Sequence, residues 1–235
     1  MKLTINLFFL LVATSLMSCI GGSKISGSGP VVPDTRMLTT VNEIVLNAPI
    51  RVELFEAEEQ TIIVHAQSNV QPVLKTMIKG ETLTISTEGN VSMDGDTYIS
   101  IALPRLKSLK NYGSANISGK GFSGDKLKLE ATAPGDISLS ELGYDDYEIL
   151  VKGSGDVTVA GRGKKLDGET SATGNLNASG LTVDKAKVTT KGSGDIMVSV
   201  GGDLKAKITS SGNVTYDGSP KIDLEKTGSG ELKGN

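Results

Sequence analysis

Gly153-Ser154-Gly155-Asp156-Val157 is one of seven short clusters that recur along the second half of the chain. Each cluster ends in a small residue, a polar residue and an aliphatic residue, and the polar residues stand at intervals of 20, 20, 19, 20, 18 and 18 positions. A fixed period in this range is the signature of a solenoid, in which each repeat stacks on its neighbours. We call these polar residues the anchors: Asn116, Asp136, Asp156, Asn175, Asp195, Asn213 and Glu231.

The residues around the anchors predict strands. An aliphatic residue follows every anchor directly, and Leu127 and Leu129 stand nine and seven positions before Asp136. Such alternation of apolar and polar residues indicates a strand with one buried face, whereas frequent Gly and β-branched residues disfavour a helix. Each repeat is therefore expected to form a short strand, a tight turn, a second short strand and a polar loop.

Stacked in parallel, these repeats predict an all-β fold of the β-helix (β-solenoid) type, with coils of roughly 18–20 residues. A leucine-rich repeat has a similar length and is the main alternative. Its Leu-x-x-Leu-x-Leu frame is suggested only at residues 103–109, so the β-helix is favoured.

The position before each anchor is Gly in six clusters and Ala115 in the first. We expect this small residue to adopt a positive φ or a tight corner. Asp and Asn suit the anchor position because their short side chains bond nearby backbone N–H groups. The alternative is a ladder of Asp136, Asp156 and Asp195 that binds cations or performs catalysis. Asn occupies the same position in other repeats, which favours a structural turn ladder with no metal site.

Residues 1–19 have the features of a lipoprotein signal peptide. Lys2 precedes an apolar stretch at residues 7–13, which is too short to span a bilayer as a permanent helix. Leu16-Met17-Ser18-Cys19 then resembles a bacterial lipobox, in which the Cys becomes the lipid-bearing N-terminus. An ordinary signal peptide with an incidental Cys is the alternative. A lipid on Cys19 would anchor the protein to a membrane, and we expect it in the cell envelope, at the outer membrane.

The remaining chain is divided by composition into a tether and one domain. Residues 20–34 are rich in Gly, Ser and Pro and are expected to form a flexible tether, and residues 35–235 a single β-helix domain. Up to about residue 110 the pattern is less regular, which indicates opening rungs of the same solenoid or, alternatively, a separate small β domain. The strands expected there are Glu43–Leu46, Ile50–Phe55, Thr61–Ala66, Thr82–Thr87 and Tyr98–Leu103.

The side chains of common enzyme sites are sparse. His65 is the sole histidine and stands in an alternating strand pattern, and no Walker loop, dinucleotide fingerprint or zinc ligand set is present, so no cofactor and no metal are expected. Acidic neighbours such as Asp145-Asp146 are expected to be solvated. We assign no catalytic residue, but a pectinase-like polysaccharide lyase or hydrolase, with carboxylates one rung apart, stays open as an alternative. A net charge of −3 without a basic patch argues against nucleic acid as a partner.

Four features in a fixed order resemble the family described as "putative auto-transporter adhesin, head GIN domain". They are the opening from Val41 to Leu54, the segment from Gly80 to Ile85, the segment from Ile101 to Leu109, and Gly-Ser-Gly-Asp at 153–156 and 192–195. The resemblance implies a right-handed parallel β-helix on a bacterial envelope lipoprotein with an adhesin-like role. It implies no catalytic or ligand-binding residue.

Together these patterns predict a non-enzymatic, lipid-anchored β-helix that presents a polar face to glycans or other envelope macromolecules. Outward Lys, Asp, Ser and Thr would supply many weak hydrogen bonds from a rigid surface. The expected partners are a membrane, through the lipid on Cys19, and a polysaccharide or an envelope protein, the latter in a scaffold or sensor role. An exposed terminal rung could also pair with a second copy, which would give a homodimer.

Overall fold

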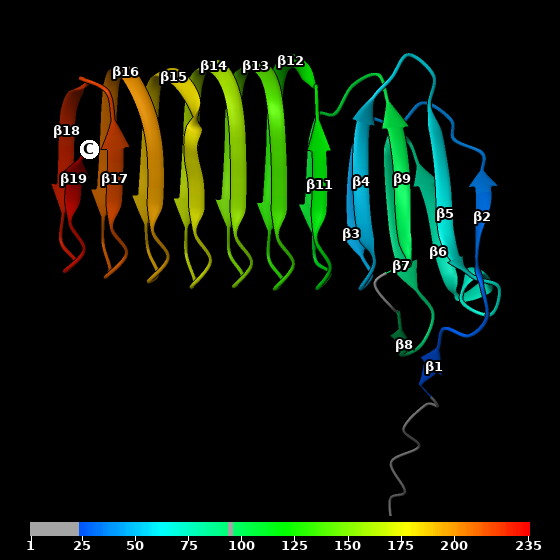
Figure 1. Ribbon diagram of the computed structural model, residues 1–235. Helices are drawn as coiled ribbons and strands as arrows, with labels where there is room; N and C mark the ends of the chain where they lie inside the picture. Colours follow the sequence, from blue (N-terminus) through cyan, green and yellow to red (C-terminus); the bar gives the residue numbers. More distant parts are fainter. Residues whose placement is uncertain (1–23, 94–95) are drawn as a thin grey trace, which may run out of the picture.

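The computed structural model describes residues 24–93 and 96–235, and these residues are built almost entirely of β-strands (Figure 1). The elements are β1 (Ile25–Ser26), β2 (Val31–Arg36), β3 (Glu43–Asn47), β4 (Arg51–Glu56), β5 (Thr61–Gln67), the short 3-10 helix η1 (Gln71–Val73), β6 (Leu74–Lys79), β7 (Thr82–Thr87), β8 (Val91–Ser92), β9 (Tyr98–Leu103), β10 (Ser108–Asn111), β11 (Ile117–Lys120), β12 (Ser123–Ala131), β13 (Ile137–Val151), β14 (Val157–Thr170), β15 (Leu176–Thr190), β16 (Ile196–Ile208), β17 (Val214–Asp217), β18 (Lys221–Lys226) and β19 (Leu232–Gly234).

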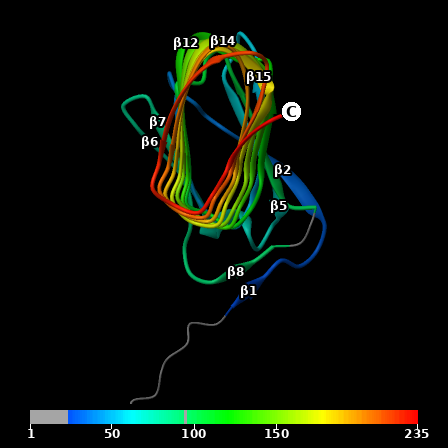
Figure 2. The ribbon, with the colours of Figure 1, turned by 90° about the vertical axis from the view of Figure 1, so that its left-hand side faces the viewer.

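The repeats stack as rungs of a parallel β-helix, which confirms the predicted fold. Equivalent residues pair in parallel from rung to rung, as Ile137 does with Val157 and Val157 with Leu176. Seen along the axis, the rungs superpose as one flattened loop (Figure 2). The aliphatic residue after each anchor therefore joins an inward column, with neighbours about 4.8 Å apart, the ordinary distance between strands.

In β13 to β16 the polar loop expected in each repeat is instead part of a long strand, whereas short connections separate β11 from β12 and β17 from β18. β13 pairs with β11 along Ile137–Ser140 and with β12 along Gly143–Val151. It thus follows one wall, bends near a register shift between Leu139 and Leu142, and returns along the opposite wall. The bend stays in the strand because backbone groups there pair with the same bend of the neighbouring rung.

Two walls enclose the core. The front wall has the order β2-β5-β9-β4-β11 and continues through the first parts of β13 to β16 into β17 and β19. The back wall has the order β6-β7-β3-β10-β12 and continues through the second parts of β13 to β16 into β18. One inward column of the back wall consists of Leu127, Tyr147, Leu166, Ala186 and Leu204, all of them buried.

The opening region shares this core but is not a set of regular rungs. β3 and β4 pair in parallel with β7 and β9 on one side and with β10 and β11 on the other. β2, β5 and β6, by contrast, pair antiparallel with their neighbours. Their inward residues, such as Ile62 and Val64, belong to the same hydrophobic cluster as the rungs. The antiparallel strands therefore cover the first end of the β-helix.

The folded part begins within the stretch expected to be the tether. Ile25–Ser26 pairs with β8, and Val31–Arg36 pairs with β5. The Arg36 guanidinium fixes β2 by donating to the carbonyl oxygens of Leu74 at 2.7 Å and Gln71 at 3.1 Å. A composition rich in Gly, Ser and Pro concealed these strands. The expected signal peptide, including Cys19, lies outside the described residues.

Candidate binding surfaces

The seven anchors line up along one edge of the β-helix. From the second anchor onward, the backbone N–H of each anchor donates to Oδ1 of the anchor one rung earlier, over 2.8 Å from Asp156 to Asp136 and from Asp195 to Asn175. The same bond recurs at Asp136, Asn175, Asn213 and Glu231. The expected side-chain bond to a backbone N–H is therefore present, but its partner is one rung away rather than nearby in the sequence. Each Asp and Asn at this edge is committed to the turn.

The glycine before the anchor makes this stacking possible. A Cβ on Gly194 would overlap the carbonyl oxygen of Gly174, and a Cβ on Gly212 would overlap that of Gly194. Neither residue has a positive φ. Of the two reasons given for glycine, the tight corner is correct here, because the backbones of successive turns approach too closely for any side chain.

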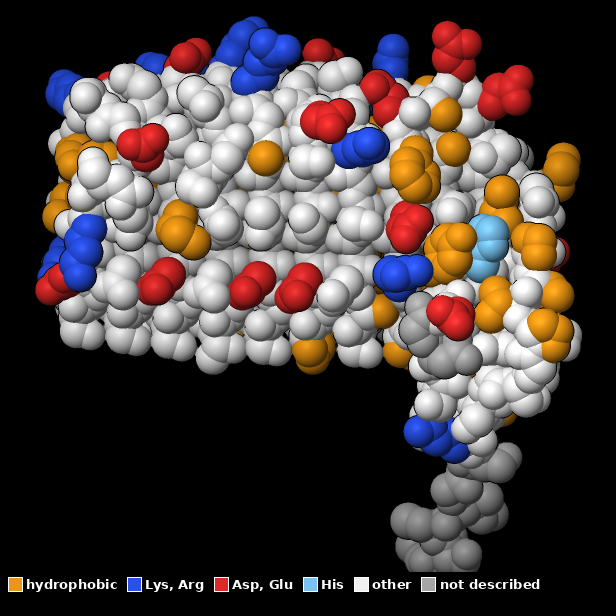
Figure 3. Space-filling model, viewed as in Figure 1, with side chains coloured by type: hydrophobic (Ala, Val, Ile, Leu, Met, Phe, Trp, Pro, Cys, Tyr) orange, Lys and Arg blue, Asp and Glu red, His pale blue; other side chains and the backbone are white. Residues whose placement is uncertain are grey.

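The front wall presents a row of side chains that carry almost no charge. They stand two positions after the first six anchors and lie in register from rung to rung: Ser118, Ser138, Thr158, Asn177, Met197 and Thr215. We call them the uncharged row. Charged residues flank the row in the same register, Glu53 beside Ser118 and Lys233 beside Thr215. Figure 3 shows this face as largely free of charged groups, with a line of acidic side chains near its lower edge. The row was not predicted from the sequence, although its residues stand at a fixed distance of two positions from the anchors and could have been recognised from that pattern.

An aromatic group lies at the end of the uncharged row, on the opening region. His65 and Tyr98 stack with ring centroids 4.3 Å apart, and the Arg51 guanidinium carbon lies 5.0 Å from the Tyr98 centroid. Phe55 is 40% exposed and pairs in register with Lys120 of β11. His65 thus lies on a strand surface, as predicted from its pattern, but no sequence pattern indicated the rings beside it.

A shallow hollow lies between Phe55 and the start of the row. It has a volume of about 270 Å³. Its lining combines Phe55 and three serines with one acidic and one basic residue: Glu53, Leu54, Phe55, Ser118, Gly119, Lys120, Ser138 and Ser140. An aromatic ring and hydroxyl groups therefore face one concave surface. That combination of an apolar plate with a few polar groups is typical of small-ligand subsites.

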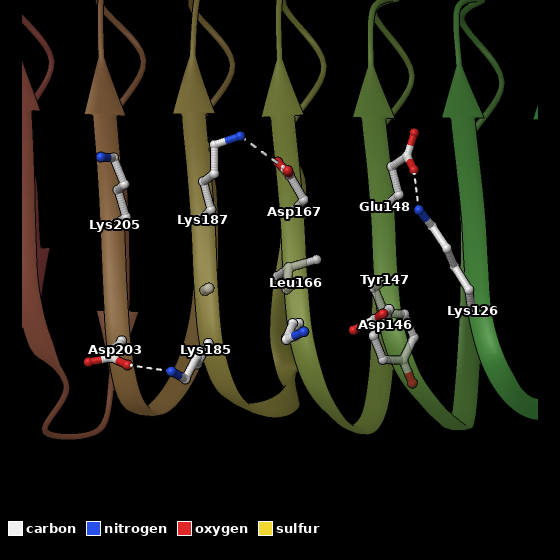
Figure 4. Close-up of a pocket in the computed structure, with 12 residues that line it drawn as sticks. Lys126, Asp146, Tyr147, Glu148, Leu166, Asp167, Lys185, Lys187, Asp203 and Lys205 are labelled. Carbon is white, nitrogen blue, oxygen red and sulfur yellow. Dashed lines mark hydrogen bonds and ion pairs between the residues drawn. The ribbon is translucent and has the colours of Figure 1, made fainter.

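The back wall presents a grid of opposite charges. Lys126 and Glu148 form an ion pair with an N–O distance of 2.6 Å, and Lys187 and Asp167 form one with a distance of 3.2 Å (Figure 4). The hydrogen bond from Lys126 is the main cause that lowers the pKa of Glu148, with Lys128 adding to it. The side chains of this grid are largely solvated, and such pairs contribute little free energy each.

A second hollow, of about 380 Å³, lies on this grid (Figure 4). Its floor consists of Tyr147, Leu166 and Ala186, which are at most 4% exposed. Two of the lysines at its rim, Lys185 and Lys187, already pair with carboxylates. The hollow thus offers a ligand little apolar contact.

The other candidate groups lie apart from these surfaces. Asp145 pairs with Lys164 at 2.9 Å in an exposed position. Within residues 24–93 and 96–235, no group of three or more His, Cys, Asp or Glu side chains is arranged to hold a metal ion. In the same residues no helix has the length and apolar character needed to cross a membrane.

The family follows from a direct match. The model of the family described as "Putative auto-transporter adhesin, head GIN domain" matches residues 41–220. The chain belongs to this family. Its adhesin-like members are surface or envelope-associated, so the present adhesin-like β-helix is a protein of that location. A search of curated proteins finds no match.

Solved structures share the fold of this adhesin-like protein. A "putative adhesin" from Bacteroides fragilis has a TM-score of 0.85 at 21% identity, over 90% of this chain and 100% of that one. Another from Parabacteroides distasonis has a TM-score of 0.71 at 22% identity, over 91% and 100%. A "putative lipid binding protein" from Parabacteroides distasonis has a TM-score of 0.71 at 19% identity, over 91% and 100%.

Proposed function

We propose that this protein is a non-enzymatic, lipid-anchored adhesin whose front wall contacts glycans. The observation that carries the proposal is the uncharged row, which runs in register along the β-helix and shares a hollow with the exposed ring of Phe55. A sugar ring has C–H groups that pack on an aromatic ring and hydroxyls that bond to Ser, Thr and Asn.

The front wall suits a neutral glycan better than the back wall does. A ligand on the uncharged row displaces less water from charged groups than a ligand on the back-wall grid, and removing such water is costly. The row is also held by strands paired on both sides, so little conformational freedom is lost on binding. Many weak hydrogen bonds from a rigid surface can then add up along an extended chain.

The test is a glycan array probed with the full-length protein in mild detergent. We expect binding to neutral envelope or host polysaccharides, and we expect Phe55→Ala to weaken it about tenfold or more. Tyr112→Ala is the matched control, because Tyr112 is 44% exposed but lies away from the hollow. Equal losses in both variants, or no glycan binding at all, would contradict the proposal. Release of shortened or unsaturated sugars would instead support the enzyme alternative.

We also propose that Cys19 carries the lipid that holds the protein on the outer membrane. The lipobox Leu16-Met17-Ser18-Cys19 supports this. Metabolic labelling with a fatty acid should mark the protein, and Cys19→Ser should abolish both the label and the membrane fraction. Labelling that persists in the Cys19→Ser variant would exclude this anchor.

Two further partners remain proposals. On β18, Ile222 is 41% exposed and Leu224 is 44% exposed, whereas their register partners one rung earlier, Leu204 and Ala206, are buried. This exposed apolar surface supports pairing of the last rung with a second copy. Sedimentation that shows a monomer at high concentration would exclude the dimer. An envelope protein that co-purifies with the chain, in the absence of any glycan binding, would favour the scaffold role.

A further inference from the structure

A large groove lies where the opening region meets the regular rungs. Its volume is about 990 Å³, and it is lined by the β9–β10 loop, by β10 and by the start of β12. Leu106 and Tyr144 form a buried floor, and the Tyr144 hydroxyl fixes the loop by donating to the Leu106 carbonyl oxygen at 2.6 Å. The groove is therefore a formed concavity with a rigid base.

The groove exists because one strand is shorter than its neighbour. β12 pairs with β13 from Ser123 onward, but with β10 only from Lys128 onward. The stretch Ser123–Leu127 thus has a strand partner on one side only. Its other edge faces the groove, which leaves backbone donors and acceptors for a ligand.

Basic residues outnumber acidic residues in the lining of the groove, although the whole chain carries −3. Five basic and three acidic side chains line it. Lys107 pairs with Glu81 at 3.4 Å, and Lys126 and Lys128 pair with Glu148. Arg105 and Lys110 make no ion pair within the described residues, so their charges are available to a ligand.

We propose that this groove binds an acidic polysaccharide, with Arg105 and Lys110 contacting its carboxylates. The cations come from both the β9–β10 loop and the strands β10 and β12 rather than converging on one point. That spread matches a chain of regularly spaced charges better than a single phosphate. The free edge of β12 and the groove's acidic side chains then bond the sugar hydroxyls.

The experiment is calorimetric titration of the full-length protein, in mild detergent, with oligogalacturonate. Binding is expected to weaken as salt is added, because exposed charges are screened. Arg105→Ala/Lys110→Ala should weaken it at least about tenfold, since hydrogen bonds to charged groups are the strong ones. Arg162→Ala/Lys165→Ala is the matched control and should change it less than about twofold. Arg162 and Lys165 are exposed, make no ion pair in the described part of the chain and lie outside the groove.

Three other probes test the ligand class. Methyl-esterified oligogalacturonate, inorganic phosphate and poly-glutamate should all bind more weakly than the acidic sugar. Equal binding of the ester, tighter binding of phosphate or of the peptide, or equal losses in both double variants would overturn the proposal.

This inference rests on the proposed role in glycan contact, but the two can fail separately. Phe55→Ala reports on the front wall, and Arg105→Ala/Lys110→Ala reports on the groove. Neutral glycans that bind through Phe55, with no binding of oligogalacturonate, would refute the groove alone. Oligogalacturonate that binds through Arg105 and Lys110, with no neutral glycan bound, would refute the front-wall proposal alone.

Discussion

The regular rungs and the opening region enclose one core by different means. In the rungs, one bond type is repeated, from an anchor N–H to the Oδ1 of the previous anchor. In the opening region, different side chains stabilise different connections. The side-chain amide of Gln60, for example, accepts a hydrogen bond from the Val41 N–H and donates one to the Val41 carbonyl oxygen, each over 2.9 Å. The rungs therefore depend on close repetition, and the opening region depends on individual side chains.

This difference predicts that one substitution has unequal effects in the two regions. Gly194→Ala should destabilise the protein by about 3 kcal/mol or more, because the new methyl group overlaps the backbone of the previous rung. Gly80→Ala should cost only about 1 kcal/mol, because Gly80 has φ +61° but open space around its Cα. Denaturant unfolding of both variants measures the two costs. A larger loss for Gly80→Ala would contradict the comparison.

Removing one anchor hydrogen bond should lower the free energy of unfolding by less than Gly194→Ala does. Asn175→Ala should cost about 1–2 kcal/mol, because the buried side of the turn loses the acceptor for the Asp195 N–H. Asn175→Asp keeps that oxygen but removes the Nδ2 group that donates to Asp156 Oδ1 at 3.0 Å, so we expect it to lose part, but not all, of the stability that Asn175→Ala loses. Gln60→Ala should cost a similar amount in the opening region, where two bonds are lost. Thermal unfolding checks the series, and an equal loss in Asn175→Ala and Asn175→Asp would show that the bond is not the cause.

The smallest effect concerns pH. The pKa of Glu148 in the rungs is lowered mainly by Lys126, and that of Glu81 in the opening region mainly by its hydrogen bond from Asn42. A carboxyl whose folded-state pKa is lowered stabilises the fold above its ordinary value of 4.5, and this contribution disappears as pH falls through the lowered pKa.

We therefore expect Glu148→Gln to lose less stability than the wild type on acidification below 4.5. The difference should stay under about 1 kcal/mol, because the group is mostly solvated. Glu81→Gln should show a change of the same sign. Unfolding midpoints at neutral and acidic pH measure both, and a wild type that is no more acid-sensitive than Glu148→Gln would contradict the ion-pair explanation.

The rungs could be predicted from the sequence because the same pattern of small, polar and aliphatic residues recurs in each one. Asp156 and its equivalents mark every turn, and the aliphatic residue after each anchor marks the core. The opening region could not be predicted as well, because β2 and β6 have no repeat to compare and their strands pair antiparallel. Of the surfaces, the uncharged row was recoverable from its offset to the anchors, whereas the groove depends on the lengths of β10 and β12 in space.

The central functional claim is that the front wall, and not the back wall, meets neutral glycans. Thr158→Arg and Ser171→Arg test it directly, because both replace an exposed hydroxyl side chain by the same cation. Thr158 lies in the uncharged row, whereas Ser171 follows β14 at the end of the back-wall grid. In binding assays with a neutral polysaccharide, we expect Thr158→Arg to weaken binding strongly and Ser171→Arg to leave it unchanged. The reverse result, or equal losses, would contradict the account.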